Sequence, residues 1–322
     1  MKRPTIRDVA QRAGVSISAV SYILNGSDKK KYAPETVERV RQAAQALAYV
    51  PSSIARSMRA RQAHTLGVVT YWSMGERVFV KLLEGIVAHA ARENYAVLLC
   101  PQGAQLEYYQ NGRMDGVIYV APPSGNRLCE EEADVRAMRE AGIPCVIIHG
   151  QSRLPDVNYL YFDFYNAIEA LVSYLTDQGY REITYVAPEP DGAADGPELT
   201  ERLRGYTETM RARGLAPDFC PDTRIAERMP DFRAVIANKS DTARRVLHLA
   251  LEQGYRVPED FPVVAGNTEN YSEYLYPPLT TTQFPFEQMG ERAAEVLLGQ
   301  IRGEQTPVVE YARCSVLRHQ SG

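Results

Sequence analysis

Residues 5–25 read TIRDVAQRAGVSISAVSYILN, and this stretch decides the fold of the first part of the chain. Its first half carries an apolar face at the i, i+3, i+4 spacing of a helix, made of Ile6, Val9 and Ala10. Gly14 can adopt the left-handed backbone that ends such a helix, and Ser16 can cap a second helix through its side-chain oxygen. The stretch therefore predicts two short helices joined by a tight turn, which is a helix-turn-helix.

The second of these helices has an inward and an outward face. The inward positions are apolar, namely Val20, Ile23 and Leu24, and the outward positions are Ile17, Ser18, Ser21 and Tyr22. The second helix of a helix-turn-helix is placed to enter the major groove of DNA. The outward side chains are therefore candidates for contact with DNA.

The residues around this motif are strongly basic. Residues 1–62 carry 12 Lys and Arg against 4 Asp and Glu, a net charge of +8, whereas the whole chain is −4, so the remainder carries −12. A basic head on an acidic body indicates a polyanionic partner for the head alone, and a solvated basic face is the alternative. The lysines that end at Lys31 can lie near phosphates, and Pro34 suits the first position of a third helix, expected over 34–47.

A short basic segment, residues 51–62, lies between this head (1–50) and the rest of the chain. One interpretation is a plain linker. The other is a hinge helix that orders on DNA and lies in the minor groove, with Met58 as an apolar wedge between base steps and Arg56 and Arg59 at the backbone.

From Thr65 onward, short apolar runs alternate with amphipathic helices. Strands are expected at 66–71, 95–100, 116–120, 145–148, 159–162, 182–186, 234–237, 262–265 and 308–317, and helices at 80–93, 130–141, 166–178, 198–213, 240–253 and 286–302. Apolar strands between helices predict an α/β body of parallel sheets covered on both faces. Because the pattern repeats, we expect two doubly wound lobes, 63–158 (with a return of about 286–305) and 159–322. Their ligand cleft is expected outside the carboxyl ends of the strands.

The sequence lacks the features that identify several other classes of protein. No apolar run is long enough to span a membrane, and the N-terminus leads into an amphipathic helix instead of a secretory signal, so we expect a cytoplasmic protein. The five cysteines are scattered and the five histidines have no ligand spacing, which predicts neither disulfides nor a metal site. No phosphate loop, Gly-x-Ser-x-Gly or His-Glu-x-x-His motif occurs, so neither an enzyme nor a cofactor is expected.

Motifs along essentially the whole length resemble the LacI/GalR family of bacterial transcription regulators. They lie at 5–10, 13–16 and 20–21, at Pro51 with 55–58, at 142–144, at 254–260, and at 277–281, which reads PPLTT. A helix-turn-helix alone is a moderately specific signal, whereas this head followed by the hinge and the PPLTT turn is very specific.

The resemblance implies a repressor that reads a pseudo-palindromic operator as a homodimer, with a tetramer as the alternative. It also implies a periplasmic-binding-protein-like body that senses a sugar, a sugar phosphate or another small metabolite by lobe closure. A ligand-independent repressor with a degenerate cleft is the alternative function. A transport component that shares only the body is disfavoured by the basic head.

The resemblance also assigns residues to DNA. Ile17 is expected to touch a thymine methyl group, and Ser18 and Tyr22 to hydrogen-bond base edges, although relatives commonly carry arginine at the place of Tyr22. The phosphate-binding positions are Thr5, Ser16, Ser21 and Asn25, for which capping and packing are the alternative roles. The hinge positions are Ala55, Arg56, Met58 and Arg59, where Met58 replaces the usual leucine wedge and Ser52 replaces the usual asparagine.

In the effector cleft the resemblance is weaker. It implies a ligand contact by Arg202, three residues before Gly205-Tyr206, with an ordinary surface arginine as the alternative. Polar contacts fall on Asn238, Asn267 and His149, and aromatic walls on Phe79, Phe162, Tyr71 and Trp72, each of which could equally be ordinary core. Lys239, Asn267 and His149 stand where relatives often have aspartate.

The loss of those carboxylates bears on the ligand. Arg202, Lys239 and His149 together favour an anion such as a phosphate or a carboxylate. Two stretches, 101–114 and 219–232, leave little room for the usual helices, which predicts a reshaped cleft.

Overall fold

The computed structural model describes residues 4–25, 32–49, 62–121, 128–150, 152–189, 197–267, 271–304 and 307–322. The chain divides into two compact units, Met1–Ala63 and His64–Gly322. We describe each by itself.

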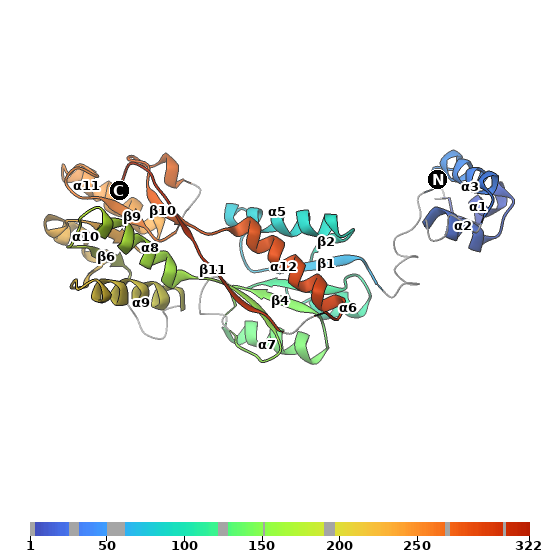
Figure 1. Ribbon diagram of the computed structural model, residues 1–322, viewed down its shortest axis with the longest axis horizontal. Helices are drawn as coiled ribbons and strands as arrows, with labels where there is room; N and C mark the ends of the chain where they lie inside the picture. Colours follow the sequence, from blue (N-terminus) through green and yellow to red (C-terminus); the bar gives the residue numbers. More distant parts are fainter. Residues whose placement is uncertain are drawn as a thin grey trace. The chain divides into compact units, whose positions relative to one another are not determined.

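The first unit is a small helical head, drawn in blue in Figure 1. It contains α1 (Ile6–Ala13), α2 (Ile17–Asn25) and α3 (Pro34–Ala46), as the sequence predicts. Gly14, with a φ of 63°, ends α1, and the Val15 amide donates to the Ala10 carbonyl across the turn. The core of the head consists of Val9, Ala10, Ala13, Val20, Val40, Ala43 and Ala44. The predicted helix-turn-helix is therefore present.

The first lobe of the second unit is built on a six-stranded sheet with the order β11-β5-β4-β3-β1-β2. Its strands are β1 (Thr65–Thr70), β2 (Ala96–Leu99), β3 (Gly116–Val120), β4 (Cys145–Ile148), β5 (Asn158–Phe162) and β11 (Val309–Ala312). Its helices are α5 (Arg77–Arg92), α6 (Gln105–Gln110), α7 (Leu128–Glu140) and α12 (Phe286–Ile301). All of its pairings are parallel.

The second lobe repeats the arrangement with the order β12-β10-β9-β8-β6-β7. Its strands are β6 (Thr184–Ala187), β7 (Asp218–Pro221), β8 (Val235–Ala237), β9 (Val263–Ala265), β10 (Thr280–Gln283) and β12 (Ser315–Leu317). Its longer helices are α8 (Phe164–Asp177), α9 (Pro197–Ala212) and α11 (Ser240–Glu252), and its short ones are η3 (Asp222–Arg224), α10 (Ile225–Arg228), η4 (Met229–Asp231) and η5 (Ser272–Tyr274). In the described part of the chain no helix is both long and apolar enough to cross a bilayer.

Each sheet is buried on both faces, which explains its continuous apolar strands. In the first lobe, α5 and α12 cover one face and α6 and α7 the other, and Figure 1 shows these two layers. Side chains alternate between the layers along a strand: Leu66 and Val68 of β1 face the α5 and α12 side, whereas Val69 faces the other. In the second lobe, α8 and α9 cover one face and α10 and α11 the other. The expected doubly wound α/β body is confirmed.

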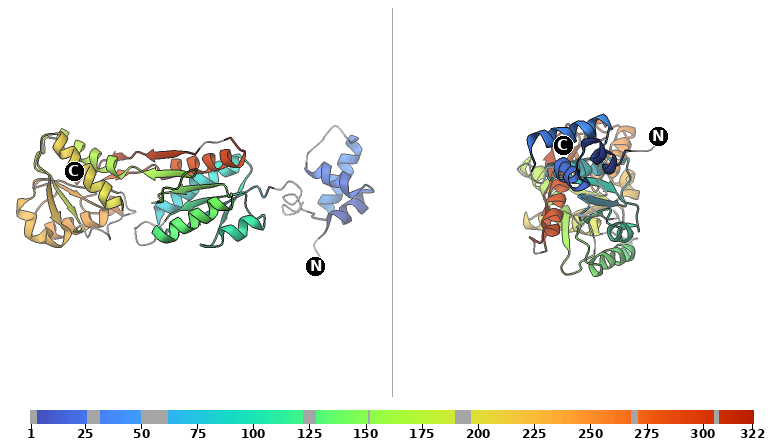
Figure 2. Two further views of the ribbon diagram at one scale, coloured as in Figure 1. Left: turned by 90° about the horizontal axis from the view of Figure 1, so that it is seen from below. Right: turned by 90° about the vertical axis from the view of Figure 1, so that its right-hand side faces the viewer.

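The two lobes exchange strands, and here the structure departs from the sequence-based expectation. We expected residues 159–162 to begin the second lobe, but β5 pairs with β4 and β11 in the first sheet. The predicted last strand, 308–317, is two strands, because β11 pairs in the first sheet and β12 pairs antiparallel to β10 in the second. Figure 2 shows the chain passing between the lobes along these segments. Each crossover contributes residues to the space between the lobes.

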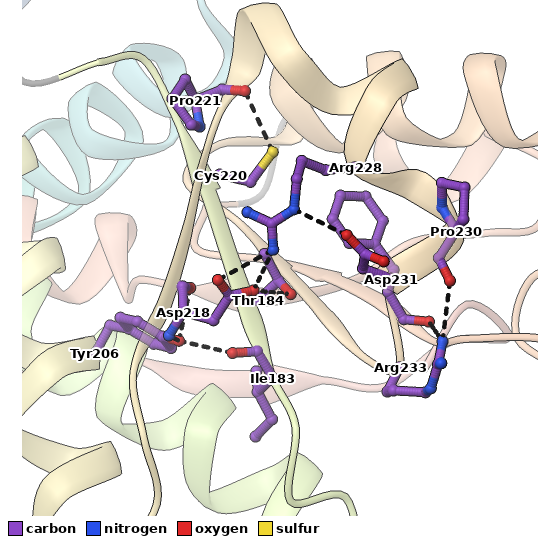
Figure 3. A network of polar contacts seen from close by, with 11 residues as sticks. Ile183, Thr184, Tyr206, Asp218, Cys220, Pro221, Arg228, Pro230, Asp231 and Arg233 are labelled. Carbon is purple, nitrogen blue, oxygen red and sulfur yellow. Dashed lines mark hydrogen bonds and ion pairs between the residues drawn. The ribbon is translucent and has the colours of Figure 1, made fainter.

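The stretch predicted to be too short for a full helix, 219–232, holds only short helical turns. A polar network ties these turns to the edge strand β7 (Figure 3). The Arg228 Nη2 donates to both carboxylate oxygens of Asp218, at 3.1 Å each, and its Nε donates to Asp231. The Thr184 hydroxyl donates to the same Asp218 carboxylate at 2.7 Å.

We expect Arg228→Ala to lower the unfolding temperature of the second unit by about 2–4 °C, or about 1 kcal/mol. The substitution leaves the Asp218 carboxylate, 43% exposed, without its arginine while Thr184 still donates to it. Arg224→Ala is the matched control, because its ion pair with Glu227 is more exposed on both sides (54% and 64%) and should contribute less. Equal shifts in unfolding temperature for the two variants would show that Arg228 does not stabilise the contact between the short helical turns and β7.

Candidate functional site

The outward face of α2 is exposed in the folded head. Ile17 is 38% and Tyr22 46% exposed, and Ser18 is also exposed, whereas Ala19 and Val20 of the same helix are buried. Large side chains that are exposed on one helix face are accessible to a partner. The three residues predicted to read bases thus share one accessible face.

Two of the predicted phosphate-binding residues act as helix caps. The Ser16 Oγ accepts a hydrogen bond from the Ala19 amide at 3.1 Å, at the start of α2. The Thr5 amide and hydroxyl both donate to the Asp8 carboxylate, at 2.7 and 2.8 Å. These contacts give both residues the alternative role that the sequence left open, although both remain exposed.

Other predicted DNA contacts have no described geometry. Ser21 of α2 is half-buried, and Asn25 is the last residue of α2 but its side chain lies outside the described residues. Lys31 and the hinge positions also lie outside them, namely Ala55, Arg56, Met58 and Arg59. Their roles stay predictions.

A cavity of about 730 Å³ lies between the two lobes of the second unit. The first lobe contributes His149, Gly150, Arg153, Tyr161, Phe162 and Tyr311, and the segment after β5 contributes Asp163, Phe164 and Tyr165. Helix α9 contributes Glu198, Thr200, Glu201 and Arg204. The cavity has the size of a small-molecule site and combines aromatic faces with charged groups, as such sites do.

Glu198, in the first turn of α9, lies at the centre of a charged cluster. One of its oxygens is 2.7 Å from His149 Nε2, which comes from the opposite lobe. Its other oxygen is 3.4 Å from Lys239 Nζ and 3.9 Å from Arg202 Nη2. Three nitrogens from two lobes therefore converge on one carboxylate.

These neighbours keep Glu198 ionised. Burial works to raise the pKa of Glu198, but the hydrogen bond with His149 and the charges of His149, Arg202 and Lys239 outweigh it and lower this pKa to about 2. Because an ionised carboxylate can only accept, the proton of the 2.7 Å contact is on His149 Nε2. His149 has a φ of 62°, an uncommon backbone conformation for a non-glycine residue.

The Arg202 guanidinium is buried, with an exposure of 1%. It lies over the Phe164 ring at 4.6 Å, and its Nη1 donates to the Asn238 Oδ1 at 3.5 Å. Its Nε has no hydrogen-bond partner. A buried guanidinium with long or missing hydrogen bonds has donors available for a ligand, so Arg202 is no ordinary surface arginine.

Some of the other predicted cleft residues gather here. Phe162 lines the cavity, and the Trp72 ring lies 6.3 Å from Phe162 and 6.0 Å from His149. The Trp72 Nε1 donates to the Ala121 carbonyl at the carboxyl ends of β1 and β3, where the strand order reverses. Asn238 is buried beside Arg202 and accepts from the Tyr185 hydroxyl at 2.8 Å.

The remaining predicted cleft residues have other surroundings. Phe79 is 1% exposed and belongs to the core between α5, α12 and the first sheet. The Tyr71 hydroxyl donates to Asp134 at 2.9 Å, on the opposite face of that sheet. The Asn267 carbonyl accepts from the Ser240 hydroxyl, and the cavity lining does not include Asn267. For Phe79 and Tyr71 the geometry favours the core role that the sequence left open.

Sequence reasoning missed Glu198 and an aromatic group on the other side of the cavity. The Tyr161 and Tyr311 rings stack with centroids 5.1 Å apart, and the Arg153 guanidinium lies 5.2 Å over Tyr161. The two tyrosines come from β5 and β11, two strands that we had assigned to other places in the fold. The sequence carries no signal that marks these tyrosines, because tyrosine is common in strands whether it is buried, as Tyr161 is, or exposed, as Tyr311 is.

Comparisons with known proteins point to one family. A family profile described as bacterial regulatory proteins, lacI family, matches residues 5–52, and a periplasmic binding protein-like domain matches residues 172–318. The chain is 28% identical to the transcriptional regulator CelR of Thermobifida fusca, over 96% of this chain and 95% of CelR. It is also 28% identical to the transcriptional repressor PurR of Vibrio atlanticus, over 92% of each chain.

Two solved structures match this chain over 99% of its length. A complex of the regulator CelR with cellobiose matches with a TM-score of 0.65 and 26% identity, covering 99% of this chain and 100% of that one. A Lac repressor dimer bound to operator and the anti-inducer ONPF matches with a TM-score of 0.77 and 20% identity, covering 99% of each chain. The match to the Lac repressor, at 20% identity, shows that the two chains share a fold.

Proposed function

The chain belongs to the LacI family of bacterial regulatory proteins, and from that membership we propose that it represses transcription by binding a pseudo-palindromic operator, under the control of a small molecule. Its relatives are DNA-binding transcriptional regulators and not enzymes. Because its target is DNA, it acts in the bacterial cytoplasm.

The observation that carries this proposal is the exposed face of α2. Ile17, Ser18 and Tyr22 project from a helix whose opposite side is fixed in the core of the head. That arrangement offers an apolar contact for a thymine methyl group and hydroxyl groups for base edges. The basic charge of residues 1–62 supplies the attraction to phosphates.

We further propose that the chain acts as a homodimer. Large apolar side chains are exposed on both lobes: Val80 and Val87 on α5, Leu251 on α11, and Tyr274 and Tyr276 near η5, at 40–89% exposure. Leu251 and Tyr276 line one surface groove, and exposed apolar side chains that gather in this way mark contacts with another protein. A two-fold dimer presents two heads to two half-sites, which is how operator symmetry mirrors protein symmetry.

The effector is proposed to bind in the inter-lobe cavity. Phe162 and Phe164 line it with aromatic faces, and Glu198 and His149 line it with polar groups. Arg202 and Asn238 lie behind this lining, where Arg202 contacts the Phe164 ring, Glu198 and Asn238. CelR was solved with cellobiose, so a sugar is a natural first class to test for this cavity. A ligand that binds only one lobe arrangement shifts operator affinity by its preference for that arrangement.

One experiment tests the proposal in two steps. The chain is used to select DNA from a random-sequence pool, and we expect paired, inverted half-sites. Sugars, sugar phosphates, nucleosides and carboxylates are then screened by thermal shift, and a stabilising compound is added to the operator titration. We expect such a compound to change operator affinity by about 5–150-fold. Failure to enrich any sequence would refute operator binding, and the absence of any active compound would favour the ligand-independent alternative.

In that assay, Arg202→Lys should abolish most of the response while leaving ligand-free operator affinity within about twofold, because lysine keeps the charge but loses the fork of donors. Arg211→Ala is the matched control, since Arg211 lies exposed in the last turn of the same helix, nine positions after the buried Arg202. An Arg202→Lys response equal to that of wild type would exclude Arg202 as a ligand contact.

A further inference from the structure

The three nitrogens around Glu198 have the geometry of an anion-binding site. His149 Nε2, Lys239 Nζ and Arg202 Nη2 approach the two carboxylate oxygens from three elements. Convergent donors that carry positive charge are what a bound carboxylate or phosphate requires. In the described part of the chain, Arg202 and Lys239 form ion pairs with Glu198 and with no other residue.

We propose that Glu198 is the chain's own occupant of this anion site, and that it thereby excludes anionic ligands from the part of the cavity that Glu198 and His149 line. The inference rests on the proposed function in treating the cavity as the effector site, and it adds which ligands that site rejects. It reverses the expectation drawn from Arg202, Lys239 and His149 alone, because those groups already share a carboxylate.

An external anion competes poorly with Glu198. The carboxylate is attached to the first turn of α9, so it is present at an effective concentration that a dissolved ion at millimolar levels does not reach. Glu198 is also only 14% exposed, and a second anion beside it would be desolvated against a like charge. A ligand with hydroxyl or amino groups instead finds Glu198 as an acceptor and the buried Arg202 Nε as a donor.

A role confined to its own helix does not explain the contacts of Glu198. An acidic residue in the first turn of a helix is favourable for the helix dipole wherever it points. Glu201, one turn further along α9, is such a residue: it pairs with Arg204 three positions away, and both side chains are substantially exposed (40% and 52%). Glu198 instead bonds across the cleft to His149, 49 positions away in the sequence.

The test uses the full chain and inorganic phosphate as the probe. Thermal unfolding is measured in about 20 mM phosphate and in sodium chloride of equal ionic strength. For wild type we expect no difference between the two salts. For Glu198→Ala we expect a lower unfolding temperature in chloride, because Arg202, Lys239 and His149 lose the carboxylate that they share, and a rise of about 3–6 °C in phosphate.

Glu201→Ala is the matched control, because it removes the same charge from the same helix and the same cavity without freeing the cluster. If Glu198→Ala is too unstable to purify, Glu198→Gln, which keeps the shape and loses the charge, should show a smaller phosphate effect of the same sign. Lys239→Ala in the Glu198→Ala background should reduce the effect.

Three outcomes would overturn the inference: stabilisation of wild type by phosphate as strong as that of Glu198→Ala, no response from either Glu198 variant, or an equal response from Glu201→Ala. None of these readouts involves DNA. The inference can therefore fail while operator binding stands, and operator binding can fail while phosphate still binds the Glu198 variants.

Discussion

Replacing Ile17, Ser18 and Tyr22 together with alanine is expected to lower affinity for the selected operator by about 10²–10⁴-fold and to leave affinity for unrelated DNA unchanged. A bidentate contact with a base edge contributes about 1–3 kcal/mol of discrimination, and the three single contacts made by these side chains should contribute about 1–2 kcal/mol each. Affinity for unrelated DNA comes from phosphates and positive charge, which the substitutions do not alter. The three positions are exposed, so the head should stay folded.

The measurement is a pair of titrations, one on the operator and one on unrelated DNA, at several salt concentrations. The slope of log K against log salt should equal that of wild type, because the number of phosphate contacts is the same. Gln42→Ala with Gln45→Ala on α3 is the control, since both residues are exposed and neutral. Equal losses on both DNAs would mean that α2 does not read bases.

Much of the fold could be predicted because its sheets are buried on both faces. A strand in such a sheet must be apolar throughout, as in Val117 to Val120 of β3, and that pattern is visible in the sequence. The edge strand β7 was missed because it reads Asp218-Phe219-Cys220-Pro221, which is polar at its start and ends in proline.

Strand β10 was missed for a different reason. It consists of Thr280, Thr281, Thr282 and Gln283, and the three threonines are fully buried. The Thr280 hydroxyl accepts from the His319 amide and donates to the His319 carbonyl, so its polar atom is satisfied by a segment 39 positions away. Such distant partners decide whether a polar strand can be buried, and no local pattern shows them.

The candidate site, like the fold, could be predicted only in part. Arg202 and Asn238 follow a motif, and the structure brings them together. Glu198 carries no signal of its own, because an acid in the first turn of a helix is common and favourable. Glu198 meets His149 only because the two lobes approach each other. Once Glu198 is included, the inferred ligand is no longer an anion but a compound with hydroxyl or amino groups.

Gly290→Ala is expected to lower the stability of the second unit by about 2–4 kcal/mol, although alanine is the better helix former by about 1 kcal/mol. Helices α5 and α12 approach each other through two glycines. A Cβ on Gly290 would lie 2.0 Å from the Leu82 carbonyl oxygen, and a Cβ on Gly85 would lie 1.9 Å from the Glu287 carbonyl oxygen. Both obstacles are backbone atoms, so no side-chain rotation relieves the overlap.

To accommodate the methyl group, the helices must separate, and the separation opens the layer of side chains between them. Leu82, Ile86, Met289 and Ala293 belong to the core that holds α5 and α12 against the first sheet. The loss of packing therefore adds to the overlap and outweighs the gain in helix propensity. Gly85→Ala should behave like Gly290→Ala because the two contacts are reciprocal.

Thermal unfolding of the full chain checks this expectation. The unfolding temperature of the second unit should fall by about 5–12 °C for either variant. Gly75→Ala is the control, because Gly75 lies exposed before α5 and a Cβ there meets only the Ser73 hydroxyl at 3.7 Å. The head is a separate compact unit, so its helix content and its affinity for unrelated DNA should not change. An increase in the unfolding temperature of either variant would show that the two helices do not depend on this close approach.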